Sequence, residues 1–442
     1  MRSAIRACVT AGLVAMAPPL HAQSTSIAGN VSALVDHLPN VPRLEGVTEL
    51  RLRAMADAQV DAKPWLRFRF AGVADGLAAD RGGAVRDAAA DALEAWVEVS
   101  GAYGDLRAGM TRLAWGRLDE VPPTDVINPI DVSRYLLDGR SEARIAVPLV
   151  RGRLLPHDRI TLEGVLVPVF RHGRFDRLDE GTSPFNLFTD LPPPVCVALA
   201  GVVCDRWHFE RQEPASGDLQ GGGRLSLTTG RADWSVSAWN GFVPFGLLTG
   251  PWPAAVPTFR LVHPRYTMVG GDFETVVGEW AIRGEAAYFP KRPVQTENEA
   301  TAFGGDAVEA GAGVDRRAGD FTLSATLLFR RSHGWIKRPS DGVFRGRLGF
   351  TDLYRETIHQ SVSVVAGFSR TFNRDRVETR VFSLVNPDDR AAFLRGLVAW
   401  KPVDDVAVEA AIGWFIGEGD DVITRFGDRD FGYVRLKYYF GR

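Results

Sequence analysis

The chain has 442 residues, of which 24% are charged and 45% are hydrophobic, and its formal net charge is −2. This near-neutral charge excludes a nucleic-acid-binding chain, and the hydrophobic content excludes an acidic disordered one. The mean hydropathy of −0.07 is typical of a soluble protein. It also fits a membrane β-barrel, in which only alternate strand residues face lipid.

The N-terminus has the pattern of a secretory signal peptide. Arg2 and Arg6 precede an apolar stretch at 7–17, and a cleavage site follows at Ala22. We therefore expect residues 1–22 to be removed on export, with an uncleaved anchor as the alternative. The apolar stretch is shorter than the ~20 residues that a spanning helix needs, and no other run approaches that length. Any membrane crossing is therefore expected to use strands.

The mature N-terminus is expected to form a periplasmic segment over 23–46. One short helix is predicted there, on the apolar residues Val31, Leu34 and Val35. The barrel is then expected to occupy 47–442.

Apolar and polar residues alternate at period two along much of the chain. The clearest segment is Glu279 to Phe289, where one face is apolar and carries Trp280 and Tyr288 at its two ends, while the other is charged. Similar segments occur at 160–170, 234–238, 320–330 and 406–414. Aromatic residues at both ends of an apolar face are typical of lipid-facing strands with two interfacial girdles. A soluble β-sandwich is the alternative, since its strands alternate too.

The turns between these segments fall into two length classes. Short turns occur at 104–105, 156–158, 230–232, 278–279, 318–319, 372–375 and 402–404. Longer connections occur at 117–144, 171–219, 240–263, 290–305 and 331–357. Short periplasmic turns and long extracellular loops predict an all-β, transmembrane, antiparallel up-and-down β-barrel of about 16 strands. One more candidate strand, in which Leu50 and Leu52 alternate with Arg51 and Arg53, makes 18 strands the alternative.

The charged face of each predicted strand is expected to line a water-filled lumen. The predicted lumen-lining residues are Arg67, Arg69, Arg224, Arg283, Glu285, Arg330, Arg380, Arg395, Glu409 and Arg435. Lys401 and Lys437 lie on the same faces, and fewer acids do. A basic lumen raises the local concentration of anions, which suggests an anion preference. In the alternative interpretation these arginines pair with lumenal glutamates.

One connection has an unusual composition. Residues 117–144 combine apolar side chains with Pro122, Pro123 and an Asn-Pro pair, which make a loop rigid. A loop of this kind that folds into the lumen narrows it. The predicted constriction residues are Asp125, Asn128, Asp131, Arg134 and Arg140.

Neither a metal nor a cofactor is indicated, and no enzyme activity is expected. Cys196 and Cys204 are an even pair in an exported chain, so a disulfide between them is predicted. They lack the partners of a metal site. The histidines are scattered, and the sequence contains no G-x-S-x-G motif of a serine hydrolase.

Several motifs carry a family resemblance. Residues 106–109, Trp115-Gly116, and Asp125-Val126-Ile127-Asn128-Pro129 with Asp131 resemble the signature of a large, functionally uncharacterised family of proteobacterial outer-membrane β-barrels. Further matching segments are 165–170, 270–273, 283–288 and 433–440. The resemblance covers nearly the whole mature chain and implies the fold and location. The chain resembles more distantly the porins that pass sugars and organic acids.

The end of the chain departs from the usual pattern. Outer-membrane barrels usually finish on an aromatic residue, whereas Gly441 and Arg442 follow Phe440 here.

The sequence therefore predicts a porin-like channel in the cell outer membrane for passive diffusion of small solutes, with a preference for anions. The alternative is a component that transports or exports hydrophobic or lipid-like molecules, because Pro148 and Pro168 can kink strands at a lateral gate. The expected surroundings are outer-membrane lipid and lipopolysaccharide. The sequence leaves the oligomeric state and any periplasmic partner open.

Overall fold

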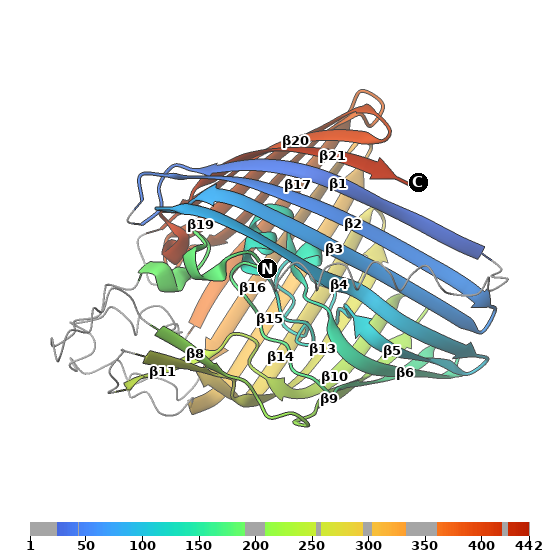
Figure 1. Ribbon diagram of the computed structural model, residues 1–442. Coiled ribbons are helices and arrows are strands. Elements are labelled where there is room, and N and C mark those ends of the chain that lie inside the picture. Colours follow the sequence, from blue (N-terminus) through green and yellow to red (C-terminus); the bar gives the residue numbers. More distant parts are fainter. Residues whose placement is uncertain are drawn as a thin grey trace.

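The computed structural model describes residues 24–42, 44–190, 208–252, 258–294, 303–332, 360–417 and 423–441. Within them, 18 strands form one sheet in which neighbouring strands are antiparallel. The first strand, β1, pairs with the last, β21, so the sheet closes into a barrel (Figure 1). No helix in these ranges is long and apolar enough to cross a membrane.

The barrel strands follow chain order around the wall. They are β1 (Ser24–Leu38), β2 (Val47–Lys63), β3 (Leu66–Asp80), β4 (Ala84–Gly101), β5 (Gly104–Thr111), β6 (Val147–His157), β7 (Ile160–Val167), β9 (Gln220–Thr228), β10 (Ala232–Phe242), β13 (Arg265–Val277), β14 (Trp280–Val294), β15 (Phe303–Ala318), β16 (Phe321–Ser332), β17 (Gln360–Phe372), β18 (Val377–Asn386), β19 (Ala391–Val403), β20 (Val406–Ile416) and β21 (Phe431–Phe440). A separate small sheet contains β8 (His208–Gln212), β11 (Leu247–Trp252) and β12 (Thr258–Val262). Short helices are α2 (Val132–Asp138), α3 (Arg140–Ala143), η2 (Glu180–Thr182), η3 (Leu187–Asp190) and η4 (Thr424–Phe426).

The expected number of 16 strands is wrong, and the alternative of 18 is correct. The two extra strands are β1 and β2, so the barrel begins at Ser24 and not at residue 47, and the segment expected to be periplasmic and helical is a wall strand. The physical reason is that Leu34 and Leu38 on the inner face of β1 are buried against the loops inside the barrel. With apolar residues on both faces, the strand loses the alternation that marks its neighbours.

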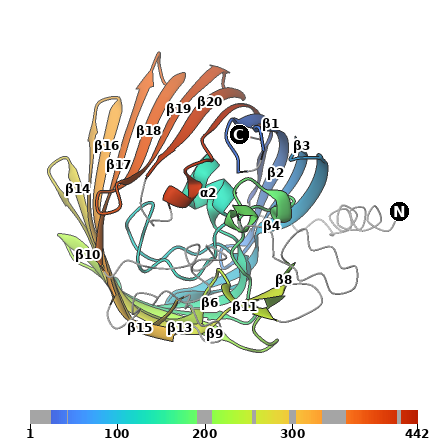
Figure 2. The same ribbon diagram turned by 90° about the vertical axis from the view of Figure 1, so that its left-hand side faces the viewer.

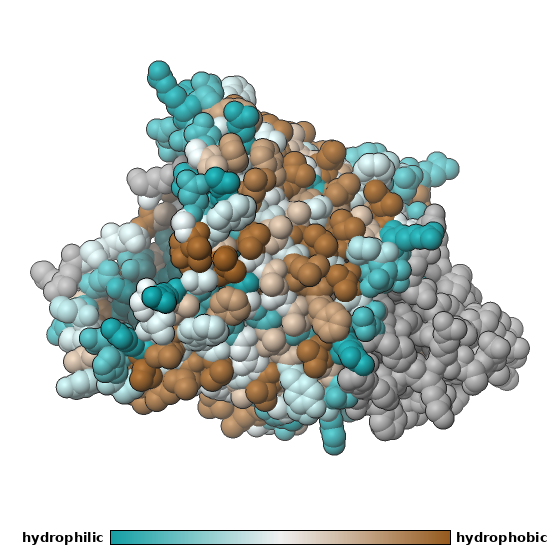
Figure 3. Space-filling view, turned by 180° about the vertical axis from the view of Figure 1, so that it is seen from behind, coloured by the Kyte–Doolittle hydropathy of each residue, from teal (hydrophilic) through white to brown (hydrophobic). Residues whose placement is uncertain are grey.

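The outer face of the wall is apolar. In β14, Trp280 and Tyr288 are 41% and 43% exposed, as a lipid-facing strand with an aromatic residue at each end requires. Figure 3 shows hydrophobic residues gathered over one side of the wall, with hydrophilic residues toward both ends of the barrel. This pattern agrees with the predicted transmembrane strands and does not fit a soluble sandwich.

The two ends of the barrel differ in their connections. At the end called the turn end, the turns within described residues span two to four residues, as at 102–103 and 373–376. The opposite end, called the loop end, carries the longer connections at 112–146 and 168–219 and also two short ones, at 81–83 and 387–390. β1 begins and β21 ends at the turn end, where the C-terminus is marked in Figure 1.

Glycine makes the seam between the first and last strands possible. Gly29 pairs in register with Phe440, and a Cβ atom on Gly29 would lie 2.3 Å from the Phe440 ring. The ring therefore lies over a strand position that has no side chain, an arrangement that shields the backbone. The last aromatic residue of the chain is thus part of the seam, and Gly441 follows it at a positive φ of 72°.

Candidate functional site

The connection between β5 and β6, residues 112–146, runs inside the barrel, and we call it the inner loop. Figure 2, which looks into the loop end, shows α2 of this loop within the ring of strands. Its first arm, the part around Arg117, contacts β13 and β14. Its second arm, which contains α2, contacts β19 and β21. The loop therefore crosses the lumen from one wall to the other.

Glu285 of β14 holds the first arm. Its carboxylate is 4% exposed and accepts hydrogen bonds from the backbone N–H groups of Arg117 (2.9 Å), Leu118 (3.2 Å) and Thr124 (2.6 Å), and from the Thr124 hydroxyl (2.7 Å). Gly116 adopts a positive φ of 86°, and a Cβ there would lie 2.5 Å from the carboxylate. Glycine is therefore required for the loop to approach Glu285 so closely.

Arg117 also attaches the first arm to the barrel wall, through ion pairs. Its guanidinium contacts Asp272 (Nε–Oδ1, 2.8 Å) and Glu274 (Nη1–Oε2, 2.6 Å) of β13. The Trp115 indole N–H donates to Glu163 of β7 at 2.7 Å. Three wall strands therefore hold one end of the loop.

The second arm of the inner loop contains α2 and α3. Asp131 caps α2 by accepting from the backbone N–H of Arg134 at 3.2 Å, and Gly139 ends it at a φ of 96°. Arg395 of β19 donates to the carbonyl of Leu136 at 3.0 Å, close to the helix C-terminus. Arg435 of β21 pairs with Asp138 at 2.6 Å.

The predicted constriction residues divide into two groups. Asp125, Asn128 and Asp131 are 7%, 6% and 2% exposed, and they hold the loop together. Asp125 pairs with Arg140 and Arg144 at 3.0 and 2.7 Å, while the Asn128 amide bridges the carbonyls of Thr111 and Ile145. Arg134 pairs with Asp75 and Asp138 at 3.2 and 2.8 Å. Arg134 and Arg140 each line one of the cavities described below.

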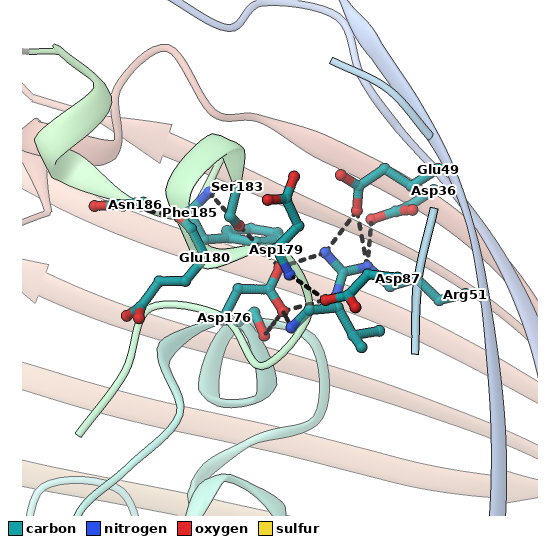
Figure 4. A network of polar contacts seen from close by, with 12 residues as sticks. Asp36, Glu49, Arg51, Asp87, Asp176, Asp179, Glu180, Ser183, Phe185 and Asn186 are labelled. Atoms are coloured by element: carbon teal, nitrogen blue, oxygen red, sulfur yellow. Dashed lines mark hydrogen bonds and ion pairs between the residues drawn. The ribbon is translucent and has the colours of Figure 1, made fainter. Parts of the chain in front are cut away.

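A second loop, residues 168–190, also packs inside the barrel at the loop end. Figure 4 shows its Asp176 and Ser183 beside Glu49 and Arg51 of β2 and Asp36 of β1. Arg51 contacts Asp176 and Glu49 at 2.7 and 2.6 Å, and Ser183 donates to Asp176 at 2.8 Å. Burial has the largest single effect on the pKa of the Asp176 carboxyl and raises it, but Arg51, Arg81 and the Ser183 hydroxyl together lower it more, so this pKa lies well below its usual range.

Two apolar clusters fill much of the lumen at the loop end. The first joins the inner loop, the second loop and the walls of β1 and β19–β21, and includes Leu34, Leu38, Leu137, Phe185, Phe393, Phe415 and Phe431. The second packs Trp115 and Ile127 against β6, β7, β10, β13 and β14, and includes Leu149, Val167, Trp239, Met268 and Phe289. The inner face near the loop end is therefore a packed core.

Two adjoining cavities separate the inner loop from the far wall, which consists of β16–β21, β1 and β2. The basic cavity, about 480 Å³, lies between the second arm and β18–β21, β1 and β2. Its charged wall residues are Arg53, Glu378, Arg380, Arg395, Lys401, Glu409, Arg435 and Lys437. The hydroxyl cavity, about 410 Å³, lies between the inner loop and β16–β19, and its wall includes Thr322, Ser324, Thr326 and Ser369. Asp138, Arg380 and Arg395 line both cavities.

Most predicted lumen-lining arginines are ion-paired. Their partners are Asp61 and Glu98 for Arg67, Asp57 for Arg69, Asp272 for Arg224, Glu274, Asp119 and Asp315 for Arg283, Glu309 for Arg330, Glu378 for Arg380, and Asp138 and Glu409 for Arg435. The expectation of a wall with few acids is wrong, because β2, β13 and β15 carry inward carboxylates that the sequence pattern did not single out. An excess of positive charge remains on β18–β21.

Removing the Asp138 carboxylate is expected to weaken the attachment of the second arm to β21, by an amount that depends on pH. Burial alone raises the pKa of the Asp138 carboxyl, but Arg435 and Arg134 lower it more, so this pKa lies well below its usual range. Such a carboxylate stabilises the folded state at pH values above its pKa in the unfolded chain, about 4. This contribution is lost as the pH falls toward the pKa in the folded state. Asp138→Asn is therefore expected to lower the unfolding free energy by about 3 kcal/mol at neutral pH.

The difference between Asp138→Asn and wild type should shrink when urea unfolding in micelles is repeated at successively lower pH below about 4. The exposed turn variant Asp158→Asn should match wild type throughout. A difference that stays constant over the acidic range would show that Asp138 acts through its shape and not its charge.

Cys196 and Cys204 lie outside the described residues, as does the predicted signal peptide at 1–22. Within the described ranges, no group of three or more His, Cys, Asp or Glu side chains is arranged to hold a metal ion.

The fold resembles that of several solved structures with little sequence identity. OccAB4 of Acinetobacter baumannii superimposes with a TM-score of 0.52 at 10% identity, over 96% of this chain and 100% of that one. OccK5 (OpdH) of Pseudomonas aeruginosa gives 0.51 at 9%, over 95% and 98%. OccK2 (OpdF) of Pseudomonas aeruginosa, in complex with glucuronate, gives 0.50 at 11%, over 95% and 98%. These likenesses establish the barrel fold.

Sequence comparison identifies the family. No curated protein matches the chain. A family model described as a protein of unknown function, DUF1302, matches residues 78–440. Since this match covers most of the sequence, the chain belongs to the DUF1302 family.

Proposed function

We propose that this protein is a porin-like channel of the outer membrane, through which small solutes diffuse passively with a preference for anions. The observation that carries the proposal is the pair of adjoining polar cavities inside a closed barrel, between the inner loop and the far wall. An inward loop that leaves a polar space along one wall is what a selective pore needs.

Two unpaired positive charges support the anion preference. Arg395 donates to the carbonyls of Tyr135 and Leu136, and in the described part of the chain it has no carboxylate within ion-pair distance. Lys401, on the same inner face of β19, likewise has no ion pair with a described residue. Both line the basic cavity. Uncompensated charges facing water attract counter-ions, whereas paired arginines contribute little.

Other observations agree with this function. The apolar outer wall suits a membrane, and the similar structures are of Occ porins, one of them in complex with glucuronate. Passage of small acidic solutes, with outer-membrane lipid and lipopolysaccharide around the barrel, extends these likenesses to this chain. The alternative, transport of hydrophobic molecules through a lateral gate, gains no support at Pro148, which pairs in register with Met110 so that β5 and β6 stay joined.

Planar bilayer recordings test the proposal. The purified full chain is expected to give ohmic openings in KCl, and a reversal potential in a KCl gradient that shows chloride permeating faster than potassium. Cation selectivity would contradict the anion preference. A silent barrel that copurifies with lipid would contradict the channel and favour the alternative.

A further inference from the structure

A row of hydroxyl groups follows the inner face of β16. Thr322, Ser324 and Thr326 alternate with outward-facing residues, and Ser369 of β17 pairs in register with Thr322. All four line the hydroxyl cavity. None of these hydroxyls has a hydrogen-bond partner among the residues that the structure describes. They are therefore available to a solute, each as both donor and acceptor.

The neighbouring row provides an aromatic surface. Ser324, Gly367, Phe382 and Arg395 are register partners in turn across β16, β17, β18 and β19. A Cβ atom on Gly367 would lie 2.4 Å from the Ser324 hydroxyl oxygen, so a side chain there would displace this hydroxyl. The missing side chain leaves space for the Ser324 hydroxyl beside Phe382 on this row. An apolar ring face of a solute can pack on Phe382 at this position.

Charged groups stand on two sides of this row. Arg380, the register partner of Ser369, is paired with Glu378, which also lines the cavity. The Arg395 guanidinium lies 5.6 Å from the Phe382 ring centroid. A planar guanidinium is suited to bind a carboxylate with two hydrogen bonds. The inner loop supplies Asp119 and Glu120 on the other side of the cavity. Carboxylate oxygens accept hydrogen bonds from solute hydroxyls.

We infer that the hydroxyl cavity is a binding subsite for polyhydroxylated carboxylates of monosaccharide size, such as sugar acids. The solute carboxylate binds the Arg395 guanidinium, its hydroxyls bind the β16 row and Ser369, and its ring face packs on Phe382. A volume of about 410 Å³ is in the range of small-molecule sites. This inference rests on the proposed function, because it assigns a solute class to the same pore.

Other solute classes satisfy only part of this lining. A carboxylate without hydroxyls leaves the β16 row unmatched, and a neutral sugar lacks a group for Arg395. Displacing water from a polar surface without replacing its hydrogen bonds weakens binding. The subsite should therefore prefer solutes that carry both groups.

Three probes separate these contributions: glucuronate, cyclohexanecarboxylate and methyl glucoside. Equilibrium dialysis against the full chain in micelles should show saturable binding of glucuronate that is at least about tenfold tighter than binding of either other probe. Reversal potentials under bi-ionic conditions should rank glucuronate above cyclohexanecarboxylate in permeability. Equal binding of the two acids would overturn the inference.

The double variant Thr322→Val/Ser324→Ala tests the residues. Its glucuronate affinity should fall about five- to tenfold, with cyclohexanecarboxylate binding unchanged. Thr322→Ser keeps the hydroxyl and should bind like wild type. The matched control is Ser363→Ala, an inward hydroxyl of β17 outside the cavity. Wild-type affinity in the double variant would overturn the inference.

Failure of the subsite and failure of the channel give different results. Wild-type protein that conducts KCl but binds both acids equally has the proposed function without the subsite. Wild-type protein that binds glucuronate selectively but does not conduct has the subsite without the channel.

Discussion

Replacing Glu285 by alanine is expected to raise the single-channel conductance in KCl several-fold. The variant removes the acceptor for three backbone N–H groups and one hydroxyl of the inner loop. Hydrogen bonds to charged groups contribute about 1.5–3 kcal/mol each. With this anchor gone, the first arm leaves β14 and the lumen widens. Planar bilayer recordings of wild type and variant at the same salt concentration measure the change.

The matched control for this variant is Glu279→Ala. Glu279 is a glutamate in the adjacent turn that pairs with Arg316 and has a 66% exposed side chain. The single-channel conductance of Glu279→Ala should equal that of wild type. If Glu285→Ala also conducts like wild type, then Arg117 and the second arm suffice to hold the loop, and Glu285 is not its main anchor.

The double variant Arg395→Gln/Lys401→Glu is expected to turn the pore from anion-selective to cation-selective. Glutamine can still donate to the carbonyls of Leu136 and Tyr135, so the second arm keeps a contact. The lining of the basic cavity loses two positive charges that have no ion pair with a described residue, and it gains a negative one. At low ionic strength the ratio of chloride to potassium permeability should fall by about an order of magnitude.

Salt provides an internal check on this charge effect. Screening shortens the reach of the field, so the difference between wild type and double variant should shrink in concentrated KCl. Lys63→Gln removes an exposed charge at the turn end and should leave selectivity unchanged. Persistent anion selectivity in the double variant would show that the paired arginines, and not Arg395 and Lys401, set the preference.

The sequence predicts the fold best where the two faces of a strand meet different surroundings. In β16 the outer face is apolar and the inner face carries hydroxyl groups that line a cavity, so apolar and polar residues alternate cleanly. In β1 the inner face instead packs against the loops through Leu34 and Leu38, and the alternation fades. β1 therefore escapes prediction from the pattern, whereas β2 alternates through Leu50 and Leu52 and supports the alternative of 18 strands.

The candidate site is predicted only in part, for a related reason. The apolar composition of the connection at 117–144 indicated that it packs against other parts of the chain, as it does through Ile127 and Leu137. This composition did not indicate which charges of the connection would be buried, because the partners lie far away along the chain. Glu285, expected on the lumen wall, binds backbone groups of residues more than 160 positions earlier. Such pairings depend on how the barrel closes.

The seam has a consequence for the order in which the chain assembles. β1 and β21 come from opposite ends of the sequence, and β21 also contacts the inner loop through Tyr433 and Arg435. During synthesis the inner loop exists long before its partner strand does. The second arm therefore reaches its final position only when the last strand arrives. Barrel closure and completion of the pore are then one late step, of the slow kind that contacts between distant segments impose.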